Sequence, residues 1–122
     1  MVGEFYRGKA RITPGFQYFT SVMRPASRGS VTLASKDPKA DPLIRLNFLT
    51  APGDLEQLRE GLRKTREMIA QRSWDELRGE ELSPGKHLQS DAELEAWIRD
   101  NAGTTFHACS TCRMGVDEMA VV

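Results

Sequence analysis

The chain has 122 residues, of which 39% are hydrophobic and 28% are charged. This length and composition predict a single globular domain with a modest core. The 17 Lys and Arg residues balance the 17 Asp and Glu residues. A formal charge of zero argues against nucleic-acid binding and against a polybasic membrane anchor.

Residues 1–15 form a polar stretch with several Gly and Arg residues that ends in a Pro-Gly turn signal. We expect a loosely ordered lead-in there, and a domain over residues 16–122. The first four residues, Met-Val-Gly-Glu, do not begin a basic region followed by an apolar run, so no secretory signal is visible. Two closely spaced cysteines do not make a disulfide framework, and they predict reduced thiols in the cytoplasm.

Three short strands are predicted in the first half of the chain. Apolar residues alternate with polar ones over residues 16–23, 30–35 and 43–48, and aromatic or β-branched side chains are frequent. Pro and Gly residues punctuate the short connections. This arrangement favours an antiparallel sheet.

Helical spacing of leucines begins after residue 54. Asp54 and Gln57 have the form of a capping box, and they predict a helix over about residues 54–72. Ser90 and Glu93 form a second capping box before another apolar stripe. Strands followed by helices predict an α+β fold, an antiparallel β-sheet with helices packed on one face.

The first interpretation of the chemistry is a metal site. His107, Cys109 and Cys112 are residue types that bind zinc, with His87 as a remote fourth candidate. A structural zinc site needs four ligands, and a second Cys pair or His pair is missing from the sequence. We therefore expect no metal.

The second interpretation is thiol redox chemistry, because Cys109 and Cys112 have C-x-x-C spacing. The βαβ context of a redox motif is missing, and Arg113 stands where covalent haem attachment needs a histidine. Packing or weakly polar roles are the simpler interpretation for both thiols.

The third interpretation makes His107 a general base or a partner in hydride transfer. An imidazole titrates close to working pH and suits that role. A lone histidine after an aromatic residue is more often structural, and residue types alone leave both roles open.

The segment 107–115, His-Ala-Cys-Ser-Thr-Cys-Arg-Met-Gly, resembles the pattern His-Pro-x-x-Thr-x-x-Met-Gly of the GMC (glucose–methanol–choline) oxidoreductase family. Its Thr-Cys-Arg-Met-Gly part is typical of the choline dehydrogenase branch, although Ala108 replaces the usual proline. Residues 23–31 are similar to the family block Arg-Pro-x-Ser-Arg-Gly-x-Val, and residues 37–49 match its Asp-Pro…Pro…Asn-Tyr-Leu continuation.

This resemblance implies that residues 16–122 are a partial C-terminal substrate domain of an FAD-dependent alcohol dehydrogenase of choline type. Such an enzyme moves a hydride from an alcohol to the flavin and gives an aldehyde. His107 matches the first active-site histidine, which takes the alcohol proton or stabilises the alkoxide. Thr111 matches a position at the flavin edge. The implied partners are the flavin domain of the parent protein and a small alcohol.

The chain itself contains no Gly-x-Gly-x-x-Gly motif, so we expect the isolated chain neither to bind FAD tightly nor to oxidise an alcohol. Self-association through an exposed domain face is a further expectation, as is membrane association of the otherwise cytoplasmic parent. Arg28 and Asn47 are expected to be structural, with Arg28 satisfying turn carbonyls. The alternative function is a free-standing, non-catalytic binding module on the same scaffold.

Overall fold

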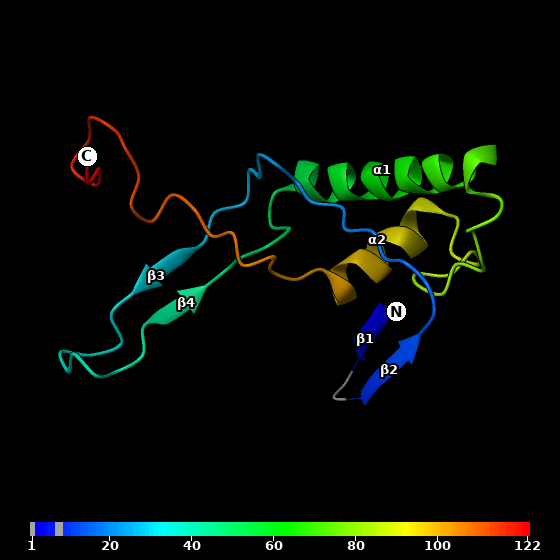
Figure 1. The fold of residues 1–122 in the computed structure, drawn as a ribbon. Helices are drawn as coiled ribbons and strands as arrows, with labels where there is room; N and C mark the ends of the chain where they lie inside the picture. The colour runs from blue at the N-terminus through cyan, green and yellow to red at the C-terminus, as the bar shows by residue number, and fades with distance from the viewer. Residues whose placement is uncertain (1, 7–8) are drawn as a thin grey trace.

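Two hairpins precede the helices along the chain in the computed structural model, which describes the backbone of residues 2–6 and 9–13 and all of residues 14–122 (Figure 1). The elements in chain order are β1 (Val2–Tyr6), β2 (Lys9–Thr13), β3 (Ser30–Thr32), β4 (Leu43–Arg45), α1 (Pro52–Ile69), the 3₁₀ turn η1 (Arg72–Trp74) and α2 (Asp91–Asn101). The predicted α+β class is confirmed.

The strands form two separate antiparallel pairs. β1 pairs with β2 from Val2 opposite Thr13, and β3 pairs with β4 from Ser30 opposite Arg45. β3 and β4 fall inside the runs that the alternation predicts, whereas the sequence pattern predicts no strand within residues 1–15. The β3–β4 hairpin extends away from the helices in Figure 1, and each helix finds its main packing surface in the other helix.

Residues 16–23 do not form the predicted strand. The rings of Phe16 and Tyr18 contact each other edge to face, with centroids 5.4 Å apart. Both also contact Trp74, at 5.3 Å and 5.9 Å between centroids. A strand needs a partner for its N–H and C=O groups, and the described part of the chain supplies an aromatic cluster there instead. The alternation of this segment therefore reflects ring packing rather than a sheet.

The apolar core lies between α1 and α2. Leu55 is 4% exposed, Leu94 is fully buried and Ile98 is 5% exposed. Burying such side chains is the main favourable contribution to folding. This core is small, so polar contacts between the helices also help to fix how the two helices pack.

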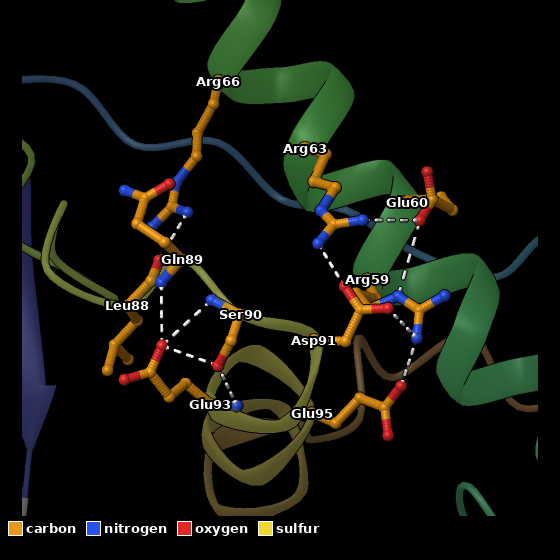
Figure 2. A network of polar contacts seen from close by, with 10 residues as sticks. All are labelled: Arg59, Glu60, Arg63, Arg66, Leu88, Gln89, Ser90, Asp91, Glu93 and Glu95. Carbon is orange, nitrogen blue, oxygen red and sulfur yellow. Dashed lines mark hydrogen bonds and ion pairs between the residues drawn. The ribbon is translucent and has the colours of Figure 1, made fainter.

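Charged side chains of α1 form ion pairs with charged side chains of α2. Figure 2 shows Arg59 of α1 between two carboxylates of α2, at 3.2 Å from Asp91 and in an ion pair with Glu95. Arg63, one turn further along, also pairs with Asp91. This network sets the register of α2 along α1.

A third arginine of α1, Arg66, fixes the loop that precedes α2. Arg66 binds the Glu81 carboxylate through Nε and Nη2, with distances of 2.9–3.1 Å. It also donates to the carbonyl oxygens of Leu88 at 2.8 Å and Gly85 at 3.1 Å. Two parallel bonds to a carboxylate are among the stronger charge-assisted arrangements, and the backbone of the loop is held against α1 by them.

The two helices begin differently. α2 has the predicted capping box, because Ser90 Oγ accepts the N–H of Glu93 at 3.3 Å and Glu93 accepts the N–H of Ser90 at 2.9 Å. α1 starts at Pro52 with no side-chain cap. The capping box predicted at Asp54 is wrong, because that carboxylate is used in a tertiary contact. None of the helices in the described residues has the length and apolarity needed to cross a bilayer.

Candidate functional site

The turn at residues 25–29 is anchored to the start of α1 by one carboxylate. Asp54 Oδ1 accepts the N–H of Ala26 and Oδ2 accepts the N–H of Ser27, each at 2.8 Å. Ser27 Oγ in turn accepts the N–H of Ala51 at 3.0 Å. Asp54 is 2% exposed, and its hydrogen bonds with the Ser27 side chain and with the N–H groups of Ala26 and Ser27 lower the pKa of its carboxyl group.

Arg28 and Asn47 complete this turn. Arg28 Nη1 donates to the carbonyl oxygens of Pro25 at 2.7 Å and Ser27 at 3.0 Å. Asn47 Nδ2 donates to the carbonyl oxygen of Arg28 at 3.1 Å, and Asn47 has a left-handed backbone with φ of 49°. The structural roles predicted for Arg28 and Asn47 are confirmed.

Gly29 explains why the turn can approach β4 so closely. A Cβ atom at this position would lie 2.3 Å from the carbonyl oxygen of Arg45 and 2.8 Å from that of Leu46. Backbone atoms cannot move aside as a flexible side chain can, so only glycine fits. The turn therefore joins the β3–β4 hairpin to α1 through backbone contacts.

His107 lies on the loop that follows α2. The Thr104 hydroxyl accepts the N–H of Phe106 at 2.9 Å. Phe106 and Ser110 then adopt left-handed conformations, with φ of 60° and 72°. Such conformations are uncommon for residues other than glycine, and they turn the chain sharply. The turns leave the side chain of His107 exposed.

Thr111 and the two cysteines share this exposed loop. Cys109 and Cys112 are both free thiols in contact with solvent, and the packing or weakly polar role expected for them stays a prediction. Ser110 Oγ lies 3.6 Å from Cys109 Sγ. The loop thus brings Thr111, both thiols and His107 to one stretch of surface.

The end of the chain folds back on itself after this loop. Arg113 pairs with Asp117, the N–H of Gly115 donates to the carbonyl oxygen of Val122 and the N–H of Val121 donates to that of Arg113, both at 3.1 Å. The ion pair with Arg113 and the N–H of Met119 lower the pKa of the Asp117 carboxyl group. The loop that carries His107 is therefore bounded by α2 on one side and by this turn on the other.

Two hollows of the described surface lie away from this loop. The larger, of about 1230 Å³, is bordered by residues 14–20, by the last turns of α1 and by the loop at residues 77–84. The smaller, of about 670 Å³, lies between residues 20–24 and the first half of α1. His107 and Thr111 line neither, and the hydrogen bonds of the described residues include none from this loop to the turn at 25–29. His107 therefore lies on an open surface and not in either of these two hollows.

The metal interpretation finds no geometry to support it. Within the residues that the structure describes, no three His, Cys, Asp or Glu side chains are arranged to hold an ion. His87, the remote fourth candidate, is exposed in the turn before α2. Elemental analysis of the chain remains the direct test.

The family pattern extends through most of the chain. A model of the GMC oxidoreductase family matches residues 25–122. This stretch includes the anchored turn, both α-helices and the exposed histidine loop. The chain therefore belongs to the GMC oxidoreductase family.

Its relatives are enzymes named for one alcohol. The chain is 46% identical over 120 residues to the oxygen-dependent choline dehydrogenase of Sinorhizobium fredii (strain NBRC 101917 / NGR234), covering 96% of this chain and 22% of the relative. It is 49% identical over 108 residues to the protein of that name from Klebsiella pneumoniae (strain 342), covering 88% of this chain and 20% of the relative. The corresponding Acinetobacter baumannii (strain AYE) protein is 48% identical over 108 residues, with the same coverage of 88% and 20%. The chain spans about a fifth of the length of these relatives.

Sequence reasoning missed two residues that shape the site region. Asp54 has the spacing of a capping residue, and nothing local indicates that it binds a turn far back in the chain. Arg66 sits among many exposed charges of α1, yet it organises the loop before α2. Both roles depend on tertiary contacts that a single sequence does not reveal.

Proposed function

We propose that this chain forms the C-terminal substrate-domain part of an FAD-dependent alcohol dehydrogenase of choline type. The observation that carries the proposal is the position of His107. It lies in the family motif, on a sharply turned loop, with its side chain directed to solvent. A histidine exposed in this way suits contact with a ligand bound between this chain and another part of the protein.

The chemistry proposed for His107 is proton transfer. Oxidation of an alcohol to an aldehyde removes a hydride from carbon and a proton from the hydroxyl group. When bound, FAD supplies the acceptor for the hydride. The neutral imidazole of His107 takes the hydroxyl proton, and the imidazolium that results stabilises remaining negative charge on the oxygen.

The residues of this chain suit contact with only one part of FAD, an edge of the flavin ring. The Thr111 hydroxyl, four residues after His107 in the same exposed loop, can donate to or accept from a polar ring atom. The first turns of α1 and α2, in contrast, carry Asp54 and Glu93. Carboxylates there oppose a pyrophosphate, so the phosphates of FAD are assigned to the rest of the parent protein.

The rest of the parent protein is also the proposed partner of the hairpin surface. The apolar side chains exposed on and around β3 and β4 are Val31, Leu33, Leu43, Ile44, Leu46 and Phe48. A soluble protein rarely leaves a contiguous apolar patch uncovered. Because the relatives are about five times as long as this chain, we assign its cover to their additional domain rather than to a second copy.

The test uses the complete reading frame that encodes this chain. The purified protein is mixed anaerobically with choline, and bleaching of the flavin absorbance is followed by stopped flow. We expect His107→Ala to slow flavin reduction by roughly 10²–10⁴-fold with nearly unchanged flavin content. His87→Ala is the matched control, because His87 is exposed in a different turn, and it should reduce flavin at the parent rate.

Two results would contradict the proposal. A complete protein without bound flavin, or one whose flavin choline does not reduce, would favour a non-catalytic binding module. Equal rates for His107→Ala and the parent protein would make His107 a structural residue.

A further inference from the structure

Two features of the histidine loop are not used by the proposed alcohol chemistry. They are the thiols of Cys109 and Cys112, both free and both exposed. We propose that this pair is a modification site, at which a peroxide forms a reversible disulfide within the loop. Closing that disulfide changes the surroundings of His107.

The backbone between the two thiols is already turned. Ser110 has a left-handed φ of 72°, and a turn over Thr111 and Cys112 follows it directly. A disulfide needs Cα atoms about 4.4–6.8 Å apart. Cys112 lies inside the turn and Cys109 comes just before the left-handed Ser110, so two residues separate the thiols and the chain bends between them. The short spacing and the bend therefore favour pairing within the chain.

The loop is also free to make the remaining adjustment. The only described hydrogen bond within residues 107–112 joins the neighbouring side chains of Ser110 and Cys109. The loop is fixed at both ends. α2, which ends at Asn101, precedes it, and the Arg113–Asp117 ion pair follows it. Closing a small ring between these ends disrupts no helix or strand of the described chain.

The reaction balances with hydrogen peroxide as the oxidant. The thiolate of one cysteine attacks a peroxide oxygen, the O–O bond breaks and hydroxide leaves. The hydroxide takes up the proton that the thiol released, so that sulfenic acid and one water form. The second thiol attacks that sulfur, a S–S bond forms, and a second water leaves. Two thiols are oxidised by two electrons, one peroxide is reduced to two waters, and a dithiol reductant reverses the change.

The ring places the change next to the proposed site. It encloses Ser110 and Thr111, and Cys109 is two residues after His107. The disulfide fixes the backbone of Thr111 and removes freedom from the segment that leads to His107. This effect on activity rests on the proposed function, whereas the thiol chemistry does not.

The first experiment uses the 122-residue chain. Thiol titration should find two reactive thiols before hydrogen peroxide is added and none afterwards. The intact mass should fall by two hydrogen atoms, the product should remain a single chain, and dithiothreitol should restore both thiols. The rate of closure should not change when the chain is diluted, because the reaction is intramolecular.

Cys109→Ser and Cys112→Ser are the matched controls. Each retains one thiol and cannot close the ring, so peroxide should add oxygen to it or link two chains. The proposal fails if the unsubstituted chain gains oxygen on one cysteine while the other thiol remains free. It also fails if the chain forms only intermolecular dimers.

The two histidines separate a local effect from a general one. The chain contains His87 and His107 and no others, and their ring protons can be followed by NMR. Oxidation should shift the His107 resonances and leave those of His87 in place, and dithiothreitol should return the His107 resonances to their original positions. Unchanged His107 resonances would overturn the coupling between the disulfide and the site.

The complete protein supplies the activity measurement. After peroxide treatment, the rate of flavin reduction by choline should fall tenfold or more, which corresponds to roughly 1.4 kcal/mol in activation free energy. Dithiothreitol should restore the rate. Cys109→Ser should keep the rate of the untreated parent protein under the same treatment. If choline never reduces the flavin, the proposed function fails while the disulfide result stands; if reduction proceeds unchanged in the fully oxidised protein, control by the disulfide is wrong.

Discussion

The carboxylate of Asp54 accepts the backbone N–H of Ser27 at 2.8 Å, across a sequence separation of 27 residues. Through this bond the first turn of α1 holds the Pro25–Gly29 turn, which Gly29 in turn presses against the end of β4. This buried carboxylate is one of the contacts that join the hairpin to the helix. The stability of that joint should therefore follow the charge of Asp54.

Asp54→Asn should lower the midpoint of thermal unfolding at neutral pH. The amide keeps the shape of the side chain, but one of its two acceptor oxygens becomes a donor that faces an N–H group. Circular dichroism at 222 nm measures the midpoint. Asp41→Asn, at an exposed carboxylate in the loop before β4, is the control and should leave the midpoint unchanged.

The same variant predicts a pH dependence. The pKa of Asp54 is lowered from its ordinary value of 3.8 in the folded chain, so ionised Asp54 stabilises the fold above that value. This contribution is lost as the pH falls from 3.8 through the lower folded pKa. The difference in midpoint between the parent chain and Asp54→Asn should therefore shrink in acid, and a difference that stays constant down to full protonation would contradict the assignment.

Leu94→Ala should be strongly destabilising. Leu94 is fully buried between α1 and α2, and removing a buried leucine leaves a cavity that costs about 2–5 kcal/mol. Urea unfolding monitored by tryptophan fluorescence gives the free energy of unfolding. Leu82→Ala is the matched control, because Leu82 is 64% exposed and its loss should cost no more than about 0.5 kcal/mol.

Ser90→Ala should destabilise the start of α2. The Ser90 hydroxyl accepts the N–H of Glu93 in the capping box, and losing such a cap costs about 0.5–2 kcal/mol. Amide hydrogen exchange should show faster exchange in the first turn of α2, with α1 much less affected. Ser73→Ala, at an exposed serine in η1, provides the comparison; equal exchange in both variants would show that the cap contributes nothing.

The sequence predicts the elements whose signals are local. The helical spacing after residue 54 identifies α1, and the Ser90–Glu93 pair identifies the start of α2. The alternating runs contain β3 and β4. Residues 16–23 show the limit of that reasoning, because the same alternation serves an aromatic cluster with Trp74 when no neighbouring strand is present.

The site is predictable in its residues but not in its surroundings. Motif resemblance selects His107 and Thr111, and the structure brings them to one exposed loop. The left-handed residues Phe106 and Ser110 carry no sequence signal, since neither is glycine or asparagine. Cys109 and Cys112 are residue types that are usually buried, and only the three-dimensional structure reveals that they are exposed.

The chain alone should not bind FAD tightly. A pyrophosphate is normally held by free N–H groups at a helix N-terminus that follows a glycine-rich turn. In α1, Pro52 has no N–H to offer and the buried Asp54 carboxylate stands in the first turn. In α2, the Ser90 and Glu93 side chains already occupy the end of the helix. Both of these N-termini therefore present negative charge where a phosphate would have to lie.

Fluorescence titration measures this directly. FAD should show no saturable change in its emission when the purified chain is added at micromolar concentration, and an established flavin-binding protein provides the positive control. Asp54→Asn removes one carboxylate from the start of α1 but leaves Pro52 there and adds no glycine-rich turn. This variant should therefore not bind FAD either. Saturable binding at submicromolar FAD by the unsubstituted chain would mean that this chain holds the cofactor by itself, and the assignment of the pyrophosphate to the rest of the parent protein would be wrong.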